Sequence, residues 1–200
     1  MARTISSVVD SLLARTRLAG NIGLTQDFAT EILTISQQIA NAHLKKVITT
    51  ANLTVNSNDI FYTLLSEFSD AIDILSMRVS GRKLLHFKTL EELSAYDPEW
   101  YTSAGESRVE GWHQIGRDYL IVYPGVTTGA TVSCEYTKAT TIKTSYAGLG
   151  AATMDLNDED TEVALKIAEL LLLVRSKKPK VIKAALDDLT LRLGINNVEK

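Results

Sequence analysis

A β-patterned stretch in the middle of the chain constrains the fold more than any other feature. Trp112 to Ile115 and Tyr119 to Tyr123 are rich in aromatic and β-branched residues, and the segment Gly116-Arg117-Asp118 separates them. A second turn signal, 124–129, precedes the alternating run from Val132 to Tyr136. The pattern predicts a three-stranded β-meander with helical sequence on both sides.

The sequence before the meander predicts a pair of helices. Apolar residues from Ile5 to Leu13 recur at helical spacing, and Gly20 to Gly23 would end the first helix. Thr25 would cap a second helix whose opposite side carries polar residues such as Gln37. The apolar stripe of this second helix has the 4-3-4-3 spacing of a coiled-coil seam: Phe28, Ile32, Ile35, Ile39 and Ala42. The short connection predicts an antiparallel hairpin of helices.

Extended patterns dominate from Thr50 to Asp155. Strands are predicted at 60–64 and 72–79, and Ser80-Gly81-Arg82 indicates a hairpin. Thr89 would cap one short helical turn that ends before Asp97-Pro98. The Thr-, Ser-, Gly- and Ala-rich segment 137–150 is expected to be mobile or ordered by a partner.

The last third of the chain returns to helical periodicity. Asn157 or Asp158 would cap a helix, with Arg175 at its end. Its predicted inner face is Val163, Ile167, Leu170, Leu171 and Val174, and Leu172 with Leu173 widens that face. Pro179 would begin a final helix that Gly194 ends, lined by Val181, Ile182, Ala185, Leu186, Leu189 and Leu193.

These elements predict an α+β fold. Residues 1–49 and 156–200 would form a helical bundle, and residues 50–155 would form an inserted antiparallel β-rich subdomain of the same single-chain unit. The apolar share of 45% and the charged share of 22% are typical of a globular protein.

Composition restricts the possible partners and the compartment. The net charge of -3 argues against a protein that binds nucleic acid tightly, because such proteins carry a basic surplus. The single cysteine, Cys134, excludes an intrachain disulfide and favours a reducing compartment. The first residues show no signal-peptide pattern, and the longest apolar run, Leu170 to Val174, is too short to cross a membrane. A soluble, cytosolic gene product with no membrane partner is expected.

No residue pattern indicates catalysis, a cofactor or a metal site. The three histidines, His43, His86 and His113, are far apart in the sequence and have no local ligand partner. A calcium loop counted from Asp155 would place Asp160 and Lys166 where glycine and glutamate are required. Gly148-Leu149-Gly150 lacks the lysine of a phosphate-binding loop, and Cys134 sits in mid-strand as a small buried apolar residue would.

Two features are candidates for a partner interface. Trp112 has apolar neighbours and is expected in a core, whereas Trp100 lies beside a turn and is either core or an interface residue. The second feature lies near the C-terminus, where a basic cluster precedes an apolar helix face: Arg175, Lys177, Lys178, Lys180, Lys183, Leu186, Leu189 and Leu193. This region either docks on a partner or completes the core of the monomer.

The order of these features resembles the head-to-tail adaptor, or connector, proteins of tailed bacteriophages. The resemblance rests on the hairpin Ser80-Gly81-Arg82-Lys83-Leu84, on Asp97-Pro98-Glu99-Trp100, on the strand Tyr119 to Tyr123 ending in Pro124, on the strand Val132 to Tyr136, and on the Leu-rich helix after an acidic cap. It covers approximately residues 25–178. The segment 137–152 departs from the pattern, because a proline-containing link is expected there.

The resemblance implies a structural virion protein of the neck. It implies a homo-oligomeric ring, commonly of twelve subunits, that binds the portal protein on one side and a tail tube or nozzle protein on the other. DNA would cross the lumen without being read, and the protein would be made in the host cytoplasm. The alternatives are another virion part, such as a tail-completion or baseplate protein, and an enzyme or small-ligand protein whose polar residues converge only in the fold.

Overall fold

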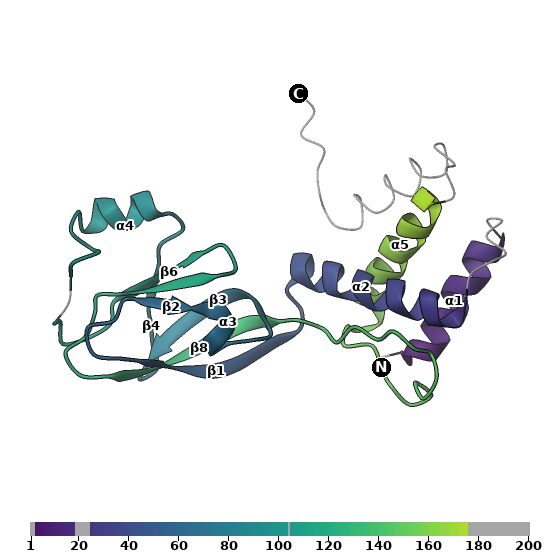
Figure 1. Ribbon diagram of the computed structural model, residues 1–200, viewed down its shortest axis with the longest axis horizontal. Coiled ribbons are helices and arrows are strands. Elements are labelled where there is room, and N and C mark those ends of the chain that lie inside the picture. The colour runs from purple at the N-terminus through teal and green to yellow at the C-terminus, as the bar shows by residue number, and fades with distance from the viewer. Residues whose placement is uncertain (1–2, 19–24, 104, 176–200) are drawn as a thin grey trace, which may run out of the picture. The chain divides into compact units, whose positions relative to one another are not determined.

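The computed structural model describes residues 3–18, 25–103 and 105–175 (Figure 1). The chain divides into two compact units. The first contains Met1–Val47 and Thr140–Lys200, and the second contains Ile48–Ala139. Each unit has its own hydrophobic core within the described residues.

The described residues of the first unit form three helices: α1 (Ile5–Leu18), α2 (Gln26–Leu44) and α5 (Asp158–Arg175). The predicted helix starts are confirmed. The hydroxyl of Thr25 accepts a hydrogen bond from the N–H of Phe28, and the side-chain oxygen of Asn157 accepts one from the N–H of Asp160. The carboxylate of Glu162 binds both Arg3 and Arg15, which joins α5 to α1 and to the residues before it.

The predicted apolar seam of α2 is only partly correct. Phe28 and Ile32 pack half-buried against the core, but the fully buried face is centred elsewhere and is made largely of small and polar residues: Ala29, Thr30, Leu33, Thr34, Ser36, Gln37, Ala40 and Asn41. Ile39, from the predicted seam, is 46% exposed. Small side chains let neighbouring helices approach closely, which a row of isoleucines on the same face would prevent.

Two buried amide side chains of α2 are hydrogen-bonded to other parts of the chain. Gln37 donates a hydrogen bond of 2.9 Å to the carboxylate of Asp155 and accepts one of 3.0 Å from its N–H. The side-chain oxygen of Asn41 accepts from the N–H groups of Lys46 and Val47, at 3.1 and 2.8 Å. These bonds offset the cost of removing amide groups from water.

The segment after residue 139 packs on α2, so the expectation of a mobile or partner-ordered segment is wrong. The N–H of Lys143 donates to the hydroxyl of Thr34 at 3.1 Å, and the N–H of Tyr146 donates to Asp27 at 2.7 Å. Leu149 lies in the helical core. The glycine- and serine-rich segment is therefore held on α2 by hydrogen bonds from its backbone N–H groups to side chains of the helix.

The leucines of α5 divide between core and surface. Leu172 is 2% exposed and Leu173 is buried, whereas Leu171 is 39% exposed. Val174, which the sequence pattern placed on the inner face, is also exposed. The four consecutive leucines thus point in different directions, as the helical repeat of about 3.6 residues requires.

The second unit contains eight strands in two four-stranded sheets. The first sheet has the order β1-β8-β3-β4 and the second has the order β2-β7-β6-β5. Their bounds are β1 (Ile48–Val55), β2 (Phe61–Thr63), β3 (Ala71–Val79), β4 (Arg82–Lys83), β5 (Leu85–His86), β6 (Gly111–Ile115), β7 (Tyr119–Tyr123) and β8 (Ala130–Lys138). Two short helices join them, α3 (Leu64–Glu67) and α4 (Leu90–Tyr96). All strand pairs are antiparallel except β5 with β6.

The two sheets share one core. Leu53, Met77 and Cys134 come from the first sheet, and Trp112 and Leu120 come from the second. A hydrogen bond of 2.8 Å from the N–H of Ile74 to the side-chain oxygen of Gln114 also connects the sheets. The predicted burial of Trp112 and Cys134 is confirmed, because they are 1% and 0% exposed.

The predicted three-stranded meander is wrong in its last strand. β6 and β7 form the expected hairpin, but β8 belongs to the other sheet, where it lies between β1 and β3. The chain crosses between the sheets after Pro124, which follows a cis peptide bond. An alternating pattern marks which residues of a strand face the core, but it does not say which sheet the strand joins.

The expected helical bundle is also wrong. The chain is α+β with two four-stranded sheets, and it is not a bundle. The bundle depended on a continuous apolar seam along α2, of which Phe28 and Ile32 are half-buried against the core and Ile39 is exposed. Within the described ranges no helix is long and apolar enough to cross a membrane.

Candidate docking surface

The outer face of the second sheet carries a small core of its own. Phe87, Leu93, Ile121 and Tyr123 are buried together there, with Trp100 partly buried against them. Leu93 belongs to α4, whose N-terminus is capped by the hydroxyl of Thr89 as predicted. α4 and the loop that follows it therefore lie against the sheet (Figure 1).

Asp97 holds the loop of residues 97–103 in place. One carboxylate oxygen accepts hydrogen bonds from Ser103 at 2.5 Å and from Tyr123 at 2.8 Å, and the other accepts from the N–H of Glu99 at 2.9 Å. The hydrogen bonds from Ser103 and Tyr123 lower the pKa of Asp97. Burial, assisted by the bond to Asp97, raises the pKa of Tyr123 to about 12. The loop is thus fixed at both ends and to the sheet.

An aromatic ridge, formed by Phe61, Trp100 and Tyr101, lies along this loop and the neighbouring strand β2. The ring centroids of Phe61 and Trp100 are 5.9 Å apart, and those of Trp100 and Tyr101 are 6.0 Å apart. Phe61 is 53% exposed and Tyr101 is 61% exposed. The indole N–H of Trp100 donates to the hydroxyl of Ser94 at 3.1 Å, which fixes the ring. Large aromatic side chains held in one orientation on a surface are typical of protein interfaces.

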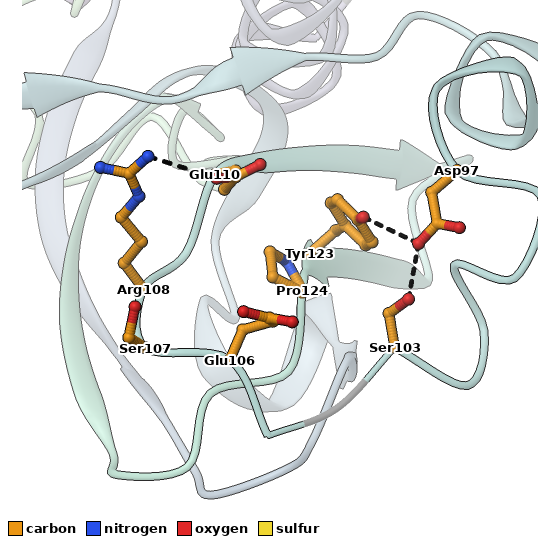
Figure 2. Close-up of a pocket in the computed structure, with 8 residues that line it drawn as sticks. All are labelled: Asp97, Ser103, Glu106, Ser107, Arg108, Glu110, Tyr123 and Pro124. Atoms are coloured by element: carbon orange, nitrogen blue, oxygen red, sulfur yellow. Dashed lines mark hydrogen bonds and ion pairs between the residues drawn. The ribbon is translucent and has the colours of Figure 1, made fainter.

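A polar pocket of about 490 Å³ adjoins the ridge. Figure 2 shows Asp97 and Ser103 on one wall and Arg108 on the opposite wall, with Tyr123 between them. Its remaining lining residues are Glu106, Ser107, Glu110 and Pro124. The 97–103 loop therefore carries the ridge and also supplies one wall of the pocket.

The pocket has an excess of negative charge. Three of its lining residues are carboxylates, Asp97, Glu106 and Glu110, against the single guanidinium of Arg108. Arg108 and Glu110 are 3.6 Å apart, and the Arg108 side chain is 67% exposed. Glu110 also accepts a hydrogen bond of 3.0 Å from the hydroxyl of Tyr96, whose ring meets that of Tyr123 edge-on.

The residues proposed from the sequence fall in different parts of the chain. Trp100 lies in the ridge, in the second unit. Arg175 is the last residue of α5, in the first unit. The remaining predicted interface residues lie outside the described part of the chain: Lys177, Lys178, Lys180, Lys183, Leu186, Leu189 and Leu193.

Sequence reasoning missed the aromatic partners of Trp100. Tyr101 follows it directly and could have been identified from the same turn. Phe61 comes from a strand 39 positions earlier in the chain, and only the pairing of β2 with β7 places it beside the loop. The reading of residues 60–64 as one strand was also incomplete, because α3 begins at Leu64.

Three other groups that were considered for chemistry, His86, His113 and Cys134, are held by packing contacts. His113 is buried, and its Nδ1 lies 2.7 Å from the carbonyl oxygen of Phe87. His86 stacks on Trp112, with 4.0 Å between ring centroids. Burial raises the pKa of the Cys134 thiol to about 12, which makes it a poor nucleophile. Among the described residues no three His, Cys, Asp or Glu side chains are grouped so that they could hold a metal ion.

Comparison with known proteins gives no family for the chain. No protein-family model matches it, and no curated protein matches it.

Proposed function

We propose that this protein is a structural subunit of the neck of a tailed bacteriophage. It joins the portal of the capsid to the tail as part of a homo-oligomeric ring, commonly of twelve subunits, and it acts by assembly rather than by catalysis. In the virion, DNA passes through the lumen of the ring. The net charge of -3 is consistent with a wall that does not retain a phosphate backbone.

The observation that carries the proposal is the aromatic ridge. Phe61 and Tyr101 expose more than half of their surface, while Trp100 is fixed by contacts on both sides. Exposing rigid aromatic rings to water is unfavourable for a free monomer, and covering them by a partner recovers that free energy. Pre-ordered rings also lose little conformational entropy when they bind.

A second observation comes from the first unit. Ile39 on α2 and Leu171 and Val174 on α5 are exposed apolar residues on helices whose other faces form the core. Outward apolar positions on helices suit contacts between the subunits of a ring. The two units thus offer separate surfaces, as a connector with neighbours on several sides requires.

Mixing experiments with virion parts test this proposal. Purified protein is added to portal-bearing capsids that lack tails, and separately to free tails from the same phage, and bound protein is counted by quantitative electrophoresis. The proposal predicts saturable binding to the capsids in a whole-number ratio to the portal. Binding to tails alone indicates the tail-completion or baseplate role instead. A protein that binds neither, and that stays monomeric in sedimentation, contradicts any virion assembly role and favours the small-ligand alternative.

A further inference from the structure

We infer that the aromatic ridge and its pocket form a docking surface for a partner protein that presents an arginine beside apolar side chains. The inference rests on the proposed function, because it takes the ridge to be a contact face. It adds the chemistry of the contact: the rings cover the apolar part of the partner, and the pocket receives the guanidinium.

Charge complementarity identifies the occupant of the pocket. Asp97, Glu106 and Glu110 face one guanidinium, so the pocket as a whole favours an incoming cation. Asp97 is already engaged by three donors from its own loop. Glu106 and Glu110 line the same pocket and are the carboxylates that meet the partner; Glu110 is held in place by Tyr96, and its ion pair with the exposed Arg108 is the one that an incoming guanidinium would share.

The shape of the lining favours arginine over lysine. A guanidinium is planar and can bind a carboxylate through two parallel hydrogen bonds while its face lies on an aromatic ring. Tyr123 lines the pocket, and Tyr96, which is half exposed, meets it edge-on. Pro124 supplies an apolar surface for the methylene stem (Figure 2).

The charge around the ridge supports the same partner. Between Lys88 and Glu110 the chain carries six carboxylates and only two cationic side chains, whereas the whole chain has a net charge of only -3. A partner with a basic surface would approach this region faster at low salt, because opposite charges steer the encounter.

The experiment uses the full-length protein and a pair of small probes. N-acetyl-arginine amide and its neutral isostere, N-acetyl-citrulline amide, are titrated while amide chemical shifts of residues 97–124 are followed by NMR. The arginine probe should shift the amides near Glu106, Glu110 and Tyr123, and the citrulline probe should bind about fivefold more weakly or worse. Raising the salt concentration should weaken arginine binding.

A double variant in the pocket and a control variant outside it complete the test. The double variant Glu106→Gln/Glu110→Gln should lose at least about fivefold in affinity for the arginine probe. Glu67→Gln, at an exposed position of α3 that does not line the pocket, should leave that affinity unchanged. Equal binding of the two probes, or unchanged binding by the double variant, overturns the inference.

The outcomes also separate this inference from the proposed function. A protein that binds arginine in the pocket but joins neither capsids nor tails overturns the assembly role alone. A double variant that no longer binds arginine but assembles as the native protein does overturns the role of the pocket in docking. Assembly lost in the double variant and retained in Glu67→Gln supports both.

Discussion

The leucines of α5 allow a sharp test of which helix face is core and which is interface. Leu172 is 2% exposed within the helical core, whereas its neighbour Leu171 is 39% exposed. Leu172→Ala removes buried methyl groups and leaves a cavity, which should cost about 3 kcal/mol. For a chain of this length that loss lowers Tm by about 9 °C. Leu171→Ala should change stability by less than about 1 kcal/mol.

Thermal and urea unfolding, followed by circular dichroism, measure both changes. Aspartate substitutions at the same two positions should differ more strongly than the alanine substitutions do. Leu172→Asp buries a charge and should abolish soluble expression, whereas Leu171→Asp should give a folded protein that no longer assembles. Equal losses of stability for the two alanine variants would refute the assignment of Leu172 to the core and Leu171 to the surface. Normal assembly by Leu171→Asp would remove that position from the subunit contact.

Four further outcomes are expected. Cys134, with its pKa raised to about 12 by burial, should not react with a disulfide reagent in the native protein at pH 8, and should react at once after unfolding in guanidinium. Burial also raises the pKa values of Tyr123 and Tyr136 to about 12, above the value of 10.0 for an unfolded chain. The stability that these tyrosines provide should therefore be complete below about pH 10 and be lost as the pH rises towards 12. Unfolding free energies measured across that pH range test this. Gln37→Ala should cost about 2 kcal/mol of unfolding free energy, because Gln37 is buried and its amide binds both the N–H and the carboxylate of Asp155, and Gln26→Ala, at an exposed position of the same helix, serves as the matched control. Asp97→Ala should free the loop and shift Trp100 fluorescence to longer wavelength, and an unchanged emission spectrum would show that Asp97 does not fix the loop.

The sequence was sufficient to predict those features that depend on one short segment of the chain. The caps of α2, α4 and α5 are each formed by a side chain within three residues of its partner, so Thr25, Thr89 and Asn157 were identifiable from the sequence. The β6–β7 hairpin was likewise predictable from its turn. Trp112, whose strand neighbours are apolar, was correctly placed in the core.

The features that could not be predicted from the sequence depend on contacts between segments that are far apart in the chain. The core face of α2 includes Gln37, which binds Asp155 more than a hundred residues away, so a count of apolar residues misplaced the centre of that face. Strand β1 pairs with β8, and its alternating residues Ala51, Leu53 and Val55 face the core, a pattern that the threonines of the strand obscured. The ridge formed only when β2 brought Phe61 to Trp100. In each case the structure depends on a contact between segments that are distant in the sequence. The periodicity of one segment does not indicate which other segment it will contact.

Binding of the protein to tailless, portal-bearing capsids tests the central claim most directly when the ridge itself is altered. The double variant Trp100→Ala/Tyr101→Ala removes two of the three rings, and Tyr119→Ala removes an exposed tyrosine of β7 outside the ridge as the matched control. All three proteins are first shown to be folded by circular dichroism, and then capsid-bound protein and the attachment of tails are measured. The account predicts that the double variant loses capsid binding or tail attachment while Tyr119→Ala retains both. Complete capsids with attached tails formed by the double variant would contradict it.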